Sequence, residues 1–123
     1  MSISNHGENA LLDAVFNGTS LAVPARYVQL HTGDPGEAGT ANVAAETDRQ
    51  EINDAAAVAG TVTSPNNLIW LNVAATETYT HVSVWDASTA GNCWWTGALT
   101  APAPVNAGNT FTIAAGDLTA SLD

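Results

Sequence analysis

The sequence predicts a mainly β fold: an antiparallel β-sandwich, of jelly-roll or Ig-like order, with a short N-terminal α-helix. Its 123 residues are enough to enclose one two-layer core without disulfides or metals. From Arg26 onward, short β-prone runs alternate with clusters of Gly, Pro, Asn and Asp, a spacing typical of a sandwich or barrel. A convincing helical period occurs once, near the start of the chain. We therefore expect a single domain over residues 1–123, with a helix segment at 1–18 and a long loop at 33–46.

The helix segment has a recognisable start, an apolar stripe and an end. Asn5 followed by Glu8 is similar to a capping box, and Asn17-Gly18 supplies the left-handed exit common after helices. A helix of about three turns does not persist alone in water, so we expect its stripe to dock on the β-core. The stripe residues recur at three- and four-residue spacing and are candidate core residues: Leu11, Leu12, Val15 and Phe16.

The β-region is predicted from runs of β-branched and aromatic residues that turn residues bound. The segment 44–57 is left open between a strand around 49–52, a single helical turn, and an arm that orders on a partner. The run 68–71 is apolar on both faces, which fits a central strand or one covered by the helix. The strands are expected near 27–31, 58–63, 68–72, 79–86, 92–99, 110–114 and 118–122.

The tryptophans are the largest side chains of an alanine-rich chain, so most of them must build the core. Because side chains alternate along a strand, Trp94 and Trp95 point to opposite faces. We assign Trp95 to the core and Trp94 to an interface. The remaining candidate core residues lie on predicted strands: Leu68, Trp70, Val82 and Val84.

The loop at 33–46 follows a predicted strand and has specific turn chemistry. Pro35 presets φ and Gly36 accepts positive φ, so the chain can reverse there. A phosphate cradle is excluded because the loop lacks lysine, and a calcium loop because Ala45 stands where a bidentate acid is needed. With little apolar surface of its own, the loop is expected to order against a neighbouring subunit or a capsid surface. Its candidate interface residues are His31, Gly33, Asp34, Pro35, Gly36 and Glu37.

The charge balance narrows the class of partner. Twelve acids and two bases give a formal charge of −10, which repels nucleic acid and anionic membranes. Arg26 and Arg49 are expected to pair with carboxylates of the chain or to make intersubunit contacts. No signal peptide or long apolar run is present, so we expect synthesis in a bacterial cytoplasm and no membrane partner.

No grouping in the sequence predicts catalysis. The histidines His6, His31 and His81 lack metal-ligand spacing, and the single cysteine, Cys93, is expected to be buried and inert. Ser83, His81 and Asp86 do not form a nucleophile elbow. We therefore expect a non-enzyme without catalytic residues, metal or cofactor. Neighbouring acids are interpreted as solvated surface rather than a glycosidase pair: Asp48, Glu51 and Asp54.

Four segments together resemble a known family. They are Ser4 to Asp13 (SNHGENALLD), Leu30 to Asn42 (LHTGDPGEAGTAN), Val82 to Ala87 (VSVWDA) and Val105 to Thr110 (VNAGNT). Their order resembles small tailed-bacteriophage virion proteins, often labelled tail-fibre proteins, whose relatives include capsid decoration (cement) proteins.

This resemblance implies a structural virion protein. We expect a capsid decoration protein on the outer capsid surface, which binds and stabilises the shell of major capsid protein. Its copies would contact one another as a homo-oligomer such as a trimer. The alternative is a tail-fibre or tail-tip module that binds a host glycan or protein receptor, and a small hydrolase is disfavoured.

Overall fold

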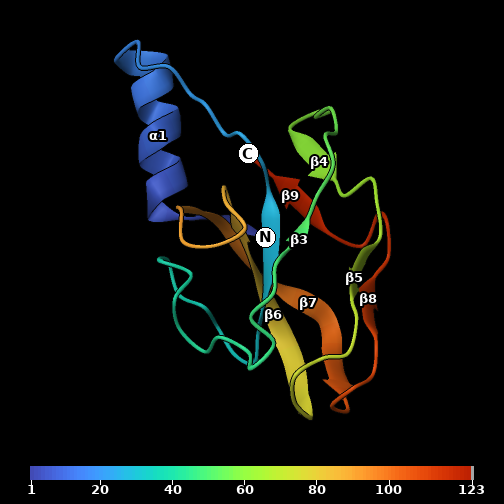
Figure 1. The fold of residues 1–123 in the computed structure, drawn as a ribbon. Coiled ribbons are helices and arrows are strands. Elements are labelled where there is room, and N and C mark those ends of the chain that lie inside the picture. Colours follow the sequence, from blue (N-terminus) through green and yellow to red (C-terminus); the bar gives the residue numbers. More distant parts are fainter. Residues whose placement is uncertain (123) are drawn as a thin grey trace.

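The computed structural model describes residues 1–122 and contains a five-stranded antiparallel sheet as its main layer. The strand order is β1-β7-β6-β2-β3, with β2 and β6 paired from Tyr27 opposite Trp85 to His31 opposite His81. Figure 1 shows these strands running through the centre of the molecule. Their bounds are β1 (Ser2–Ile3), β2 (Tyr27–His31), β3 (Gln50–Glu51), β6 (Glu77–Trp85) and β7 (Cys93–Val105).

The second layer is an interrupted two-stranded ribbon. Its strands are β4 (Thr61–Thr63), β5 (Leu68–Trp70), β8 (Phe111–Ile113) and β9 (Thr119–Ser121). β4 pairs with β9 and β5 pairs with β8, both antiparallel. Between the two ladders, the Ser64 N–H donates to the Leu118 carbonyl at 2.9 Å and the Gly116 N–H to the Ser64 carbonyl at 2.7 Å. The layers form an open sandwich, which confirms the predicted mainly β, antiparallel class (Figure 1).

The core lies between these two layers. Alternation along β2 turns Val28 and Leu30 inward, and Val82 and Val84 of β6 lie beside them. The ribbon adds buried side chains from the opposite side: Leu68, Trp70, Ile113 and Leu118. The candidate core residues on β5 and β6 are therefore buried. Trp95 is partly buried and packs against the same cluster.

The segment 44–57 is extended, which matches the strand alternative. β3 pairs with β2, and the indole N–H of Trp70 donates to the Asp48 carbonyl at 2.8 Å. Two glutamate carboxylates accept hydrogen bonds from the backbone of this segment and from a neighbouring residue. Glu77 accepts from the N–H groups of Ala45 and Glu46, and Glu46 accepts from those of Asp48 and Ala74. These bonds hold the segment to its own chain, so the interpretation as an arm that orders on a partner is wrong.

The helix α1 (Asn5–Phe16) begins at Asn5, so its cap lies one residue before the predicted one. Ser4 is the N-cap, and its hydroxyl accepts from the Gly7 N–H at 3.1 Å and donates to the Cys93 carbonyl at 2.6 Å. Gly7 is buried against Ile3 and the Trp94 carbonyl, so a side chain at this position would clash with both. The N-terminal end of the helix is thus fastened to β7.

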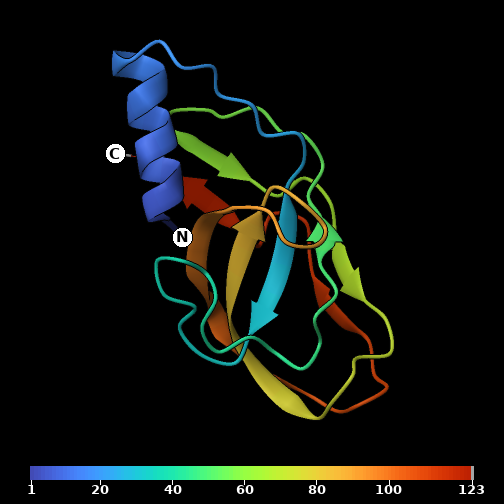
Figure 2. The ribbon, with the colours of Figure 1, turned by 60° about the vertical axis from the view of Figure 1, so that its left-hand side comes forward.

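The prediction that the helix stripe docks on the core is wrong. Leu12, Val15 and Phe16 are 56%, 72% and 82% exposed, and Leu11 is half-buried. The ribbon closes the apolar face of the sheet, so the core is completed without the helix. Figure 2 shows α1 standing beside the sandwich rather than over its core, with an extended segment leading back to β2.

Candidate functional site: an apolar cleft and an exposed helix face

The loop that follows β2 is held by its own chain. The Ala41 N–H donates to the Pro35 carbonyl at 3.1 Å, and the Asn42 amide to the Asp34 carbonyl at 2.8 Å. Gly39 lies against Cys93 and Trp85, where a side chain would not fit. Pro35 is buried, whereas Asp34, Gly36 and Glu37 are exposed and Gly33 is half-buried. The expectation that a partner orders this loop is therefore wrong.

His31 is buried rather than placed at an interface, because the loop covers the outer face of the sheet. Its Nδ1 lies 2.8 Å from the Ala41 carbonyl, which only accepts, so this nitrogen carries the proton. Its Nε2 then accepts from the Ser83 hydroxyl at 2.7 Å, and the Trp85 indole donates to the same hydroxyl at 2.7 Å. Burial lowers the pKa of His31 below 6.5 and keeps the ring neutral.

The two arginines behave differently. Arg26 pairs with Asp54, as expected for a local ion pair. For Arg49 the expected pairing with a carboxylate of the chain is wrong, and the alternative of an intersubunit contact stays a prediction. The Arg49 guanidinium lies 4.2 Å from the centroid of the Trp85 ring and donates to the carbonyls of Ala87 and Ala90 at 2.8 Å. The Trp85 face and the hairpin loop between β6 and β7 satisfy this cation without an acid.

Trp94 was assigned to an interface, and this is wrong, whereas Trp95 packs partly buried against the core cluster. Trp94 is buried, with its indole N–H 3.1 Å from Asp86 and the edge of His6 at 4.9 Å between ring centroids. Trp95 is the more exposed of the two.

Partial burial alone raises the pKa of Asp86, but hydrogen bonds from Asn92 and Trp94 outweigh it and lower the pKa. Burial raises the pKa of Cys93 to about 11, so its thiol is unreactive at neutral pH.

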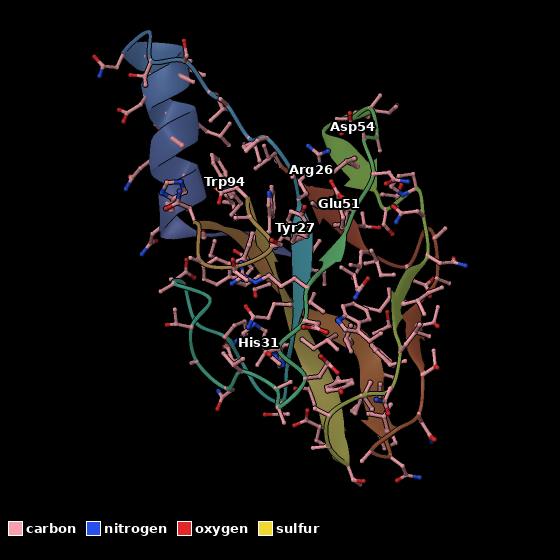
Figure 3. The ribbon with its side chains drawn as sticks, in the orientation of Figure 1. Arg26, Tyr27, His31, Glu51, Asp54 and Trp94 are labelled. Carbon is pink, nitrogen blue, oxygen red and sulfur yellow. The ribbon has the colours of Figure 1, made fainter. Side chains whose placement is uncertain are left out.

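A cleft of about 500 Å³ opens between the start of β2, the strand β7 and the ribbon of β4 and β9. Most of its lining is apolar, and Arg26 and Asp54 supply a charged pair at its edge. Figure 3 shows Arg26 at the upper end of β2 with Asp54 nearby, and Trp94 on the side toward α1. We call this feature the tryptophan cleft. Its large lining residues are Val23, Ile52, Trp85, Trp94, Trp95 and Leu118.

The second candidate surface is the exposed helix face. Leu12, Val15 and Phe16 share one side of α1, because residues three and four apart are neighbours on a helix. We call these three residues the helix stripe. Large apolar side chains gathered on one exposed face are typical of protein contact sites. The sequence pattern identified the residues of this surface but predicted the wrong location for them.

Neither surface carries recognisable catalytic or metal chemistry. Within residues 1–122, no three His, Cys, Asp or Glu side chains converge as a metal site requires. The part of the chain that the structure describes also lacks a helix long and apolar enough to cross a membrane.

The fold and the two surfaces together define a small, mainly β protein with exposed apolar contact surfaces. A protein-family model described as Podophage GP4 fiber I protein gp80 matches residues 2–121. The chain belongs to this family, which confirms the resemblance to small tailed-phage virion proteins. The family is one of structural phage fibre proteins. No curated protein matches the chain.

Proposed function

We propose that this protein is a subunit of a fibre on the outside of a podophage virion, where it acts by binding other protein subunits. The helix stripe carries the proposal. Three large apolar side chains lie in water on a twelve-residue helix that is marginal on its own. The family description supports the fibre role. The charge of −10 favours a place away from packaged DNA.

Capsid decoration is the second candidate, and the composition favours it. Only 11% of the residues are charged, which suits broad contact with a protein shell such as that of the major capsid protein. A fibre tip that binds glycan has less support. Trp85 and Trp94 are buried and Arg49 already covers a face of Trp85, so few indole faces are free to stack on a sugar.

Copy number and location on purified virions test the proposal. We expect quantitative mass spectrometry to find a few dozen copies per particle, and immunogold labelling to mark fibres. Hundreds of copies, comparable with the capsid protein and spread over the head, would establish decoration instead. Absence of the protein from purified virions would contradict both candidates.

A further inference from the structure

We propose that the helix stripe of one copy docks in the tryptophan cleft of a second copy. This inference deepens the proposed function by naming a partner for the fibre subunit. It starts from two surfaces of opposite shape on one chain. The stripe is a ridge of three exposed apolar side chains, and the cleft is an apolar hollow of about 500 Å³.

The chemistry of the cleft selects an apolar occupant. Its charged pair, Arg26 and Asp54, is joined at the edge of the cleft and leaves most of the lining apolar. Trp85 and Trp94 are buried and add apolar walls rather than open stacking platforms. Placing a Leu, Val or Phe side chain there removes apolar surface from water on both partners.

The helix stripe has the form that such a groove accepts. An amphipathic helix binds a groove through anchors at i, i+3 and i+4, and Leu12, Val15 and Phe16 have this spacing. Asp13 is exposed beside the stripe, and Arg26 is one of the two basic residues of the chain. An acid beside the ridge and a base beside the hollow give the contact a preferred orientation.

The helix is poorly placed to fill the cleft of its own chain. Ser4 bonds the Cys93 carbonyl and the Gly7 amide, and Gly7 packs against the Trp94 carbonyl. These contacts fasten the start of α1 to β7, while the stripe lies near the other end. Rolling the stripe inward would break the cap, whereas docking on another copy leaves it intact. Each copy offers one ridge and one hollow, so the contact closes as a reciprocal pair or ring, or repeats along a line.

Charge predicts how this contact responds to salt. Each copy carries a formal charge of −10, so approaching copies repel one another. The stripe and most of the cleft lining are uncharged, so salt screens the repulsion more than it weakens the contact. Association should therefore strengthen as ionic strength rises, which is the opposite of an interface held by ion pairs.

Sedimentation of the full chain over a range of protein concentrations tests the proposal. We expect a reversible oligomer that is favoured by salt. On the stripe, Val15→Asn should weaken association by about tenfold or more. Leu71→Asn is the matched control, because Leu71 is 73% exposed against 72% for Val15 but lies outside both surfaces, and it should have no effect. In the cleft, Ala57→Glu at an exposed lining position should weaken association as strongly as Val15→Asn.

Mixing the two defective variants is the decisive measurement. The Val15→Asn chain keeps an intact cleft and the Ala57→Glu chain keeps an intact stripe, so the mixture should recover association that neither shows alone. A wild-type chain that stays monomeric at every concentration would overturn the proposal. Loss of association for Val15→Asn but not for Ala57→Glu would also overturn it and would indicate pairing of stripe with stripe. A mixture in which both variants stay monomeric would overturn it as well. Thermal melts confirm that each variant is folded, and none of these outcomes depends on where the protein lies in the virion.

Discussion

Gly36 and Gly39 lie in one loop with nearly equal backbone angles, φ +69° and +70°, but their surroundings differ. A side chain at Gly36 would meet nothing within 4 Å, whereas at Gly39 it would lie 2.5 Å from the sulfur of Cys93 and 3.0 Å from its Cβ. The comparison therefore separates the cost of the left-handed backbone from the cost of a steric clash.

We predict that Gly39→Ala destabilises the fold more than Gly36→Ala does. Gly36→Ala should cost about 1–2 kcal/mol for the left-handed conformation. Gly39→Ala should add about 1–3 kcal/mol of overpacking against Cys93. Denaturant unfolding of the two variants measures the difference. Equal costs would show that the loop does not pack on the outer face of the sheet.

His31 predicts a pH dependence of stability. Its pKa in the folded chain is below 6.5, the ordinary value, so the unfolded chain binds a proton more readily. The neutral ring contributes its full stability above pH 6.5, and that contribution falls as the pH drops through 6.5 toward the folded pKa. Asp86, whose folded pKa is below 3.8, loses its contribution only at lower pH.

We therefore expect the melting temperature to fall between neutral pH and about pH 5. His31→Gln should flatten this slope whatever its effect on stability at pH 7, because it removes the titrating ring. A slope that survives in the His31 variant would assign the titration to another group.

At the scale of elements, shortening a side chain to alanine should have different effects on stability in the exposed helix face and in the β-core. Phe16 is 82% exposed, so Phe16→Ala should change the unfolding free energy of the monomer by less than about 0.5 kcal/mol. Leu68 is buried in β5, and Leu68→Ala should cost about 2–5 kcal/mol. Denaturant melts at a protein concentration below that of self-association provide the comparison. A large loss for Phe16→Ala under those conditions would mean that the stripe packs within its own chain.

The strand β7 shows how an element can run beyond its predicted end. It was expected over 92–99 and reaches Val105, through Pro102 and Pro104. Proline lacks an N–H, so it is tolerated where that position faces away from a neighbouring strand. Both prolines are exposed, and past the short pairing with β1 they lie on an edge of the sheet. Prolines at such a position discourage strand addition there, which leaves the helix and the cleft as the better contact surfaces.

At the scale of the whole molecule, the two layers close the core with β-strands alone. The sheet and the ribbon bury Leu30, Val82, Trp70 and Leu118 against one another. The loop covers the opposite face of the sheet over His31, Ser83 and Trp85. With the ribbon and the loop covering the two faces of the sheet, α1 remains beside the sandwich, and no residue of α1 lines the cleft of its own chain (Figure 2).

Features that arise from local patterns could be predicted from the amino-acid sequence alone. Alternating apolar residues, turn residues and helical spacing predicted the mainly β class, the helix near Leu12 and the buried strands around Trp70 and Val82. These signals are local because side-chain direction repeats every two residues in a strand and about every 3.6 in a helix. They also identified the stripe as an apolar helix face, which they assigned to the core of the same chain.

Only the tertiary structure decided which surfaces meet. An apolar stripe specifies that Phe16 gains from burial, but not whether the burying surface belongs to its own chain. Likewise, polar and glycine residues around His31 resembled an exposed loop until Gly39 was seen to fit against Cys93. The tryptophan cleft joins residues from Met1 to Ala120, so no local pattern could predict it. Burial depends on contacts between segments that are distant in the sequence. Which apolar faces enter the core is therefore determined only when the whole chain has packed.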